Sequence, residues 1–263
     1  MIILIPMGGE GTRFKNSGYK TNKAEILITD RKSGIKIPMI IASMKDLPGI
    51  KDKENTIICV DRKEYETNGT ENLMSSYFSN IRFIHDEILL DQAYACYLAR
   101  DHMKSDEELL IGNCDSGLNI DQKKFEEAKL HSDVIMFSQT KNDNIELDPN
   151  AHSWAVPRGS NSEISDISIK QSISRDPYFD HATTGIFWFK KASLFLKLLE
   201  EMIDSKDTFN DKYYVDKLLL YYLENDLKVT FLDVEYFCWG TPTDLQNYES
   251  TLRYWKEFLL TEI

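Results

Sequence analysis

Short apolar segments alternate along the chain with segments of helical periodicity. The apolar runs with the length of buried strands cover residues 2–5, 56–60, 109–112, 133–138 and 228–232. Apolar residues spaced three and four positions apart predict helices over 92–103, 192–203 and 214–222. This alternation favours an α/β fold, with a mostly parallel central sheet flanked by helices.

The stretch 141–175 departs from this pattern. It is rich in Asn, Asp and Ser and has little helical periodicity, so we expect loops and short strands that form a small lobe. With no repeat or low-complexity linker, the chain is interpreted as one domain, 1–263. Its parts are a first half of about 1–140, a second half of about 141–248 and a C-terminal helix of about 249–263. In that helix Trp255, Phe258 and Leu259 share one side, which we expect to pack on the body or on another subunit.

Composition limits the class of partner. The 43 acidic and 31 basic residues give a net charge of −12, which repels nucleic acid and anionic membrane surfaces. The four cysteines form no CxxC pair and are typical of reduced thiols in a cytosolic protein. The apolar segment 1–7 has no basic region before it, and no run reaches membrane-spanning length, so we expect a cytoplasmic protein with neither nucleic acid nor membrane as partner.

A glycine-rich segment follows the first predicted strand. Gly8, Gly9 and Gly11 precede Thr12-Arg13. Glycines allow backbone N–H groups to approach a phosphate, and an arginine adds guanidinium donors. The P-loop is excluded because no Gly-Lys-Ser/Thr is present, and the dinucleotide fingerprint is excluded because Phe14 stands at its third glycine. By itself the segment is equally well explained as a tight turn with a solvated arginine.

A carboxylate follows the strand over 109–112. Ligands of parallel sheets bind beyond the carboxyl ends of the strands, which is where Asp115 stands. Because Mg²⁺ is usually held by one or two carboxylates together with substrate phosphates, Asp115 is a candidate Mg²⁺ ligand. The alternative is a side chain that only caps its turn.

These motifs together resemble the sugar-1-phosphate nucleotidyltransferases, a family that includes related cytidylyltransferases. The family opens with an apolar strand, G-x-G-T-R, a lysine and a P-M-I helix start, matched here by Gly9, Gly11, Thr12, Arg13, Lys23 and Pro38-Met39-Ile40. Asn22 stands where the family usually has proline. The resemblance implies a Rossmann-like, GT-A-like fold, in which the first half binds nucleotide and the second half binds the acceptor.

The resemblance also implies roles for residues of the first half. Arg13, Lys23 and Asp115 would be catalytic, and Asp115 would hold Mg²⁺. The nucleotide would be bound by Met7, Gly8, Gly9, Gly11, Thr12 and Gln92. The Gln92-Ala93 pair would lie near the base, but Asp91 replaces the usual glycine, which leaves CTP, UTP and dTTP open.

In the second half the resemblance implies that Lys170 grips the acceptor phosphate, ahead of the strand that contains Gly185. Lys212 stands where relatives have a glutamate that contacts sugar hydroxyls, so it is assigned to the acceptor pocket. The segment 239–245 resembles the one that closes the family's catalytic domain, with Thr241 predicted to cap a helix.

One metal ligand of the family is replaced. Cys238 occupies the position of a second metal-binding aspartate, two residues before Gly240. The nearest candidates for the missing carboxylate are Asp233 and Glu235, and substrate phosphates are the alternative.

The implied reaction transfers a nucleoside monophosphate from the triphosphate to a sugar 1-phosphate or a similar phosphate monoester, with release of pyrophosphate. It would supply an activated precursor for surface polysaccharide synthesis, and it needs no histidine base, in keeping with five scattered histidines. Three alternatives remain: a cytidylyltransferase for a phosphocholine-like acceptor, a GT-A glycosyltransferase, and a non-catalytic nucleotide sensor. The glycosyltransferase needs D-x-D, which Asp115-Ser116-Gly117 lacks. A homo-oligomer stays open.

Overall fold

The computed structural model describes residues 1–66, 69–88 and 91–261, and is built on a nine-stranded sheet. Strands on its main path run in the order β10-β9-β11-β6-β1-β4-β5, and β12 and β8 join through β11. The nine strands are β1 (Ile2–Pro6), β4 (Thr56–Arg62), β5 (Ile81–Asp86), β6 (Leu109–Ile111), β8 (Val134–Gln139), β9 (Trp154–Pro157), β10 (Ile164–Ser168), β11 (Ala182–Phe189) and β12 (Val229–Asp233).

The sheet is mostly parallel, as the sequence predicts. β1 pairs in parallel with both β4 and β6, and Ile3 lies opposite Ile57 on one side and Leu110 on the other. β11 and β10 are the exceptions, because β11 runs antiparallel to β6, β8 and β9, and β10 runs antiparallel to β9. β12 continues the parallel arrangement beside β8. The two halves of the chain therefore share one sheet, and the reversed strand β11 connects their parts of it.

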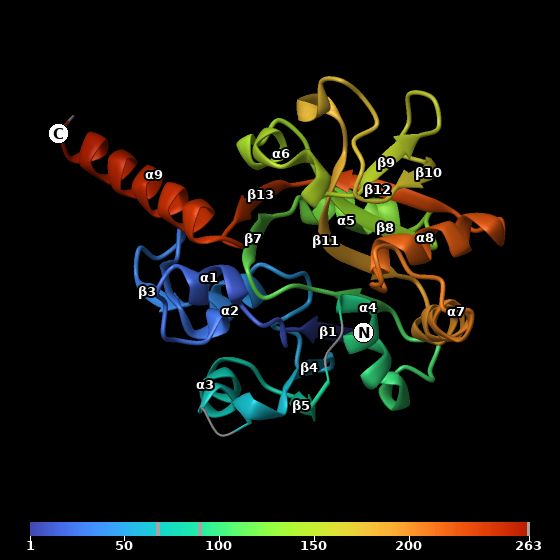
Figure 1. Cartoon of the computed structure of the whole chain (residues 1–263), viewed down its shortest axis with the longest axis horizontal. Helices are drawn as coiled ribbons and strands as arrows, with labels where there is room; N and C mark the ends of the chain where they lie inside the picture. Colours follow the sequence, from blue (N-terminus) through green and yellow to red (C-terminus); the bar gives the residue numbers. More distant parts are fainter. Residues whose placement is uncertain (67–68, 89–90, 262–263) are drawn as a thin grey trace.

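Both faces of the sheet are buried, which explains the uninterrupted apolar runs in its strands. Along β1, Ile2 and Leu4 belong to one core cluster and Ile3 and Ile5 to another. The first cluster is covered by α4 (Gln92–Leu98), α7 (Ala192–Asp204) and α8 (Val215–Glu224), and the second by α2 (Met39–Lys45) and α5 (Gln122–Lys129). Figure 1 shows α4 and α7 on one side of β1 and α2 on the other.

Smaller elements complete the fold. The remaining helices before the C-terminal one are α1 (Thr12–Asn16), α3 (Thr70–Tyr77) and α6 (Asp143–Leu147), and 3₁₀ turns cover Lys23–Glu25, Lys63–Tyr65, Arg100–His102, Pro149–Ala151 and Pro177–Phe179. Two further strand pairs are β2 (Leu27–Thr29) with β3 (Lys36–Pro38), and β7 (Ser116–Asn119) with β13 (Glu235–Cys238). The stretch 141–175 holds α6, β9 and β10 between loops, in keeping with the predicted lobe.

Two predicted helix boundaries are wrong. The helix expected over 92–103 ends at Leu98, because the chain then tightens into a 3₁₀ turn. The C-terminal helix expected over 249–263 begins much earlier, as α9 (Pro242–Thr261). Thr241 caps it, as predicted: its hydroxyl accepts a hydrogen bond from the Asp244 N–H at 3.1 Å. Residues 262 and 263 lie outside the described part of the chain.

All four cysteines are free thiols. Among the described residues, no helix is both long enough and apolar enough to cross a membrane.

Candidate active site

The glycine-rich segment forms a loop between the end of β1 and the start of α1. Gly11 precedes α1 with a φ of 62°, a left-handed conformation that favours glycine. A Cβ at Gly11 would also lie 3.4 Å from the Cβ of Lys23. The loop therefore needs glycine at this position both for its backbone conformation and for the close approach of the lysine segment.

The loop offers unpaired backbone donors. Within the described part of the chain, no protein acceptor binds the N–H groups of residues 8–13, whereas Phe14 and Lys15 both donate to the Gly11 carbonyl. The loop lines a cavity of about 620 Å³. A row of free N–H groups at a cavity wall is suited to bind phosphate oxygens.

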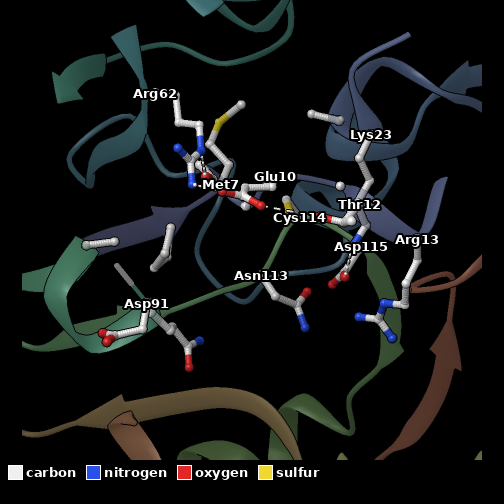
Figure 2. A pocket seen from close by; sticks show the side chains of 18 of the residues that line it. Met7, Glu10, Thr12, Arg13, Lys23, Arg62, Asp91, Asn113, Cys114 and Asp115 are labelled. Carbon is white, nitrogen blue, oxygen red and sulfur yellow. Dashed lines mark hydrogen bonds and ion pairs between the residues drawn. The ribbon is translucent and has the colours of Figure 1, made fainter. Parts of the chain in front are cut away.

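Three charged side chains predicted to be catalytic meet at one end of this cavity. The Lys23 ammonium donates to the Asp115 carboxylate, forming an ion pair. Arg13 lies beside them, and no ion pair joins it to another described residue (Figure 2). The structure thus brings Asp115 beside Arg13 and Lys23, although it lies 92 positions after Lys23 in the sequence.

Burial and charge act in opposite directions on this ion pair. Burial raises the pKa of Asp115, but the charges of Lys23 and Arg13 lower it by a larger amount, so the net shift of the pKa is downward. Burial lowers the pKa of Lys23, and the neighbouring Asp115 carboxylate outweighs that effect and raises it. Both groups are therefore charged at neutral pH, with an anionic oxygen and two cations at the floor of the cavity.

A glycine leaves one side of Asp115 open. The β7–β13 pairing places Cys238 opposite Ser116, directly after Asp115. The Trp239 N–H then donates to the Asp115 carbonyl at 2.9 Å, and a Cβ on Gly240 would lie 3.3 Å from the Asp115 carboxylate. Any side chain at position 240 would crowd the space beside this carboxylate.

The thiol of Cys238, at the position where the resemblance predicts a second metal-binding aspartate, is protonated. Burial raises the pKa of Cys238 to about 12, and the Asp244 carboxylate contributes to the same upward shift. The Cys238 sulfur lies 3.5 Å from the Asp244 carboxylate, which also accepts a hydrogen bond from the Thr241 hydroxyl at 2.6 Å. A neutral thiol is a poor ligand for a hard cation such as Mg²⁺.

The two carboxylates that the sequence suggested as replacements lie elsewhere. Asp233 is hydrogen-bonded to His181 and Ser138, at 2.8 and 2.7 Å. Glu235 accepts from the Asn119 amide at 2.9 Å, at the end of the β7–β13 pair remote from Asp115. Neither lines the cavity that Asp115 lines, so the structure does not bring either to the expected metal site.

A second cavity, of about 480 Å³, adjoins the first. Arg13, Gln92, Asp115 and Gly240 line both. The remainder of the second cavity comes mainly from the second half of the chain, including Lys170, Thr183, Thr184, Gly185, Tyr214 and Asp216. Any two ligands placed in the two cavities would meet at Arg13 and Asp115.

Lys170 and Gly185, assigned to the acceptor from the sequence, both line this second cavity. The Lys170 ammonium donates to the Ala151 carbonyl at 2.6 Å and lies 3.9 Å from the buried Asp216 carboxylate. It also lies 5.1 Å from the centre of the Tyr214 ring. Gly185 accepts a hydrogen bond from the Gln92 amide at 3.0 Å, so Gln92 joins the two cavities.

Lys212, assigned to the acceptor pocket from the sequence, lines the first cavity and not the second. Asn210 and Asp211 have φ values of 49° and 60°, and Phe209 and Lys212 exchange backbone hydrogen bonds of 2.9 and 3.1 Å around them. This is the geometry of a type I′ hairpin turn. The turn is held to the cavity by Asp91, whose carboxylate accepts from the Tyr213 N–H at 2.8 Å.

Two further residues of the first cavity were missed from the sequence. Arg62 stands at the end of β4, beside β1, and its guanidinium donates to the Gly8 carbonyl at 2.7 Å. Asp91 caps α4 by accepting from the Tyr94 N–H at 2.9 Å. Both lie across the cavity from Lys23 and Asp115 (Figure 2). Ligands bind at the carboxyl ends of parallel strands, so Arg62 would have been a candidate if the strand predicted over 56–60 had been placed two residues longer.

Comparison with known proteins identifies the fold. No protein-family model matches the sequence, and no curated protein matches it. Among solved structures, a nucleoside-diphosphate-sugar pyrophosphorylase from Vibrio cholerae RC9 superposes with a TM-score of 0.74 at 18% identity, covering 94% of this chain and 99% of that one. The chain has a nucleotidyltransferase fold. A candidate glucose-1-phosphate thymidylyltransferase from Bacillus anthracis gives a TM-score of 0.72 at 19% identity, with 96% of each chain covered.

A third nucleotidyltransferase-fold structure extends this likeness. The inositol-1-phosphate CTP transferase from T. maritima gives a TM-score of 0.66 at 15% identity, again with 96% of each chain covered. Because both chains are covered almost completely in all three cases, the likeness extends over almost the whole fold. The fold predicted from the sequence is therefore confirmed.

Proposed function

We propose that this chain is a nucleotidyltransferase that moves a nucleoside monophosphate from a triphosphate to a phosphate monoester and releases pyrophosphate. The observation that carries the proposal is the junction of the two cavities at Arg13 and Asp115. One cavity has the free backbone donors of the glycine loop, and the other has Lys170. Transfer between two bound phosphates requires such a meeting point, because the reacting atoms must lie in contact.

The triphosphate belongs in the first cavity. Backbone N–H groups of residues 8–13 would bind its phosphate oxygens, and Arg13 would neutralise charge at the junction. Lys23 would exchange its contact with Asp115 for the α-phosphate. Gln92 and Lys212 line the same cavity beyond the loop, and we place the nucleoside there, with CTP, UTP and dTTP as the donors to test.

The reaction would be an in-line displacement at the α-phosphorus. An acceptor phosphate oxygen forms the new P–O bond as the bond from the α-phosphorus to the bridging oxygen breaks, and that oxygen leaves with the pyrophosphate. The attacking phosphate is already ionised at neutral pH, so no base has to remove a proton. The task of Arg13, Lys23 and Lys170 is to position the two phosphates and to offset their mutual repulsion.

The residues at the junction fit an Mg²⁺ ion that is bound together with a nucleotide. Asp115 is ionised, and Gly240 leaves the space beside its carboxylate open. One carboxylate together with substrate phosphates is a common Mg²⁺ environment. Bound there, Mg²⁺ would withdraw charge from the phosphate oxygens during transfer. Because Cys238 is a neutral thiol and not a second carboxylate, the substrate phosphates would supply more of the Mg²⁺ ligands.

The acceptor would occupy the second cavity, with its phosphate between Arg13 and Lys170 and its remainder toward Tyr214. The family default is a sugar 1-phosphate, and the solved structures named above include proteins for glucose 1-phosphate and inositol 1-phosphate. We therefore propose a small polyol or sugar phosphate, from which an activated precursor for surface polysaccharide would be made. A phosphocholine-like acceptor offers the same attacking group.

A pyrophosphate-release screen tests this proposal. The chain is supplied with each of four nucleoside triphosphates, Mg²⁺ and a panel containing sugar 1-phosphates, inositol 1-phosphate and phosphocholine. We expect release with one triphosphate and only when a phosphate monoester is present. Release without any acceptor dependence, or none with any pair, contradicts the proposal. Transfer from a nucleotide sugar in place of a triphosphate would indicate the glycosyltransferase alternative.

A further inference from the structure

The outer half of α9 has an apolar face that no described part of the chain covers. Near the body, Leu245 and Tyr248 are buried, at 5% and 9% exposure. Farther along, Trp255 and Leu259 are 53% and 62% exposed. Figure 1 shows that this end of the helix leads away from the rest of the molecule. A contiguous exposed apolar surface of this kind marks an interaction site.

The covered and uncovered residues belong to one seam. Its positions follow the alternating three- and four-residue spacing of a coiled-coil helix: Leu245, Tyr248, Leu252, Trp255 and Leu259. The body covers the first part of the seam, where Leu252 is half-buried, and leaves the last part exposed. The packing face of α9 is therefore longer than the surface that the rest of the chain offers to cover it.

Two more aromatic residues widen the exposed part of the seam. Tyr254 and Phe258, one helical turn apart, stack with ring centres 6.3 Å apart, and Trp255 packs edge-on against Phe258 at 5.7 Å. Arg253 and Glu257 occupy the other side of the helix, and Lys256 flanks the seam. The outer half is thus clearly amphipathic, and its apolar side is pre-arranged by contacts among its own rings.

The base of α9 is fixed to a hairpin that also presents apolar residues. Glu249 accepts hydrogen bonds from the N–H and hydroxyl of Thr29, both at 2.7 Å, and the Tyr248 hydroxyl donates to the Thr29 carbonyl at 2.8 Å. On the same β2–β3 hairpin, Leu27 and Ile35 are 57% and 63% exposed. One copy therefore offers an apolar site at each end of the helix, a spacing suited to an antiparallel partner.

We infer that this face binds a second copy of the chain, with the two α9 helices packed antiparallel about a two-fold axis. At about 200 Å² for a large side chain, the exposed residues of α9 and the hairpin present roughly 650 Å² per copy. Two copies would then bury roughly 1,300 Å², which is within the range of specific protein interfaces. The inference is independent of the proposed reaction.

Charge favours this occupant over a lipid surface. The net charge of −12 repels anionic membranes, so the aromatic face has no long-range attraction toward them. The outer half itself does not share that excess: residues 253–259 contain two basic side chains and one acidic one. The contact itself therefore brings together no excess of acidic side chains.

Analytical ultracentrifugation of the full chain tests the interface. We expect the wild type to sediment at twice the 30.5 kDa chain mass in the low micromolar range. Trp255→Glu places a charge in the seam and should weaken the dimer by at least about 30-fold. Arg253→Glu places the same side chain on the opposite face and should leave the dimer intact. Circular dichroism confirms that both variants retain their helices.

Three results would overturn the inference. One is a wild-type monomer at all concentrations up to about 100 µM, and another is a Trp255→Glu variant that dimerises as the wild type does. The third comes from sedimentation with vesicles of phosphatidylcholine and phosphatidylglycerol: a monomer that sediments with them would assign the aromatic face to membranes.

Discussion

At the scale of single residues, the junction between the cavities depends on one ion pair. Lys23 and Asp115 hold each other charged at the floor of the first cavity, and the open space at Gly240 leaves the carboxylate accessible. The same carboxylate is therefore both a structural partner of Lys23 and the proposed Mg²⁺ ligand. Substituting Asp115 affects the ion pair and the proposed metal site differently, so the two roles can be measured separately.

Asp115→Asn should lower turnover at least about 100-fold, because the amide cannot provide an anionic ligand at the site of transfer. It also leaves the Lys23 ammonium without its counter-charge, so some stability should be lost. Pyrophosphate release at limiting and saturating Mg²⁺, together with thermal unfolding, measures both effects. Asp166→Asn, on an exposed strand position, is the control. Near wild-type turnover of Asp115→Asn at limiting Mg²⁺ would remove it from the metal site.

Asp61, at the end of β4, should make stability depend on pH. Burial raises its pKa from 3.8 to about 6. The folded state then binds the proton more tightly than the unfolded state, so this contribution to stability is lost as pH rises through about 6. Above that pH the buried charge costs about 3 kcal/mol, at 1.36 kcal/mol per pKa unit.

Asp61→Asn should consequently be about 2–3 kcal/mol more stable than the wild type at pH 7.5 and should lose that advantage near pH 4. Urea unfolding at the two pH values measures it. Asp166→Asn is a matched control, because Asp166 is exposed yet accepts the N–H of its following residue at 2.8 Å, as Asp61 does. An advantage that is equal at both pH values would show that the charge of Asp61 is not responsible.

At the scale of elements, short turns decide which cavity each lysine serves. The type I′ turn at 209–212 and its contact with Asp91 present Lys212 to the first cavity. Lys170, itself in a left-handed conformation with a φ of 54°, is held in the second by Ala151 and Asp216. Two lysines of the same half of the chain thus line different cavities.

Lys170→Ala should raise the acceptor KM tenfold or more and leave nucleotide affinity nearly unchanged, since a charged hydrogen bond contributes about 1.5–3 kcal/mol. Lys212→Ala should do the reverse, with a smaller effect because the side chain is exposed. Saturation kinetics for each substrate and calorimetry with nucleotide alone separate the two. Lys197→Ala, on the exposed side of α7, is the control. An acceptor-specific effect of Lys212→Ala would return this residue to the acceptor cavity.

At the scale of the whole molecule, the first cavity draws residues from both halves of the chain. Most of its lining comes from before residue 116, and Lys212 and Gly240 come from the second half. The ligand of such a cavity stabilises the folded state as a unit, because it is bound only when both halves are in place.

The correct nucleoside triphosphate with Mg²⁺ should therefore raise the melting temperature without any acceptor. At 100 times its Kd it adds about 2.7 kcal/mol, equivalent to roughly 5–10 °C for a chain of this size. Differential scanning calorimetry measures the shift. The matching nucleoside, which lacks phosphates, should give little or none, and Arg13→Ala should reduce the shift. An equal shift with the nucleoside would show that the glycine loop does not bind phosphate.

The sequence by itself determined the features that local physics controls. Apolar runs located β1, β4, β6, β8 and β12 to within two residues, because strands buried on both faces need uninterrupted apolar residues. The glycine loop, Asp115 and the Thr241 cap were also predictable, since each depends on backbone conformation or on a residue's place at a strand or helix end.

Only the tertiary structure decided which of these residues meet. The reversed direction of β11, the placement of Lys212 in the first cavity and the remoteness of Asp233 and Glu235 from Asp115 depend on strand pairing and on one turn. Strand pairing and the geometry of a single turn leave no periodic signal in the sequence. A strand's apolar pattern is the same in either direction. A side chain's neighbours across a cavity are set by contacts between residues far apart in the sequence, such as Lys23 and Asp115, 92 positions apart, which no local spacing records.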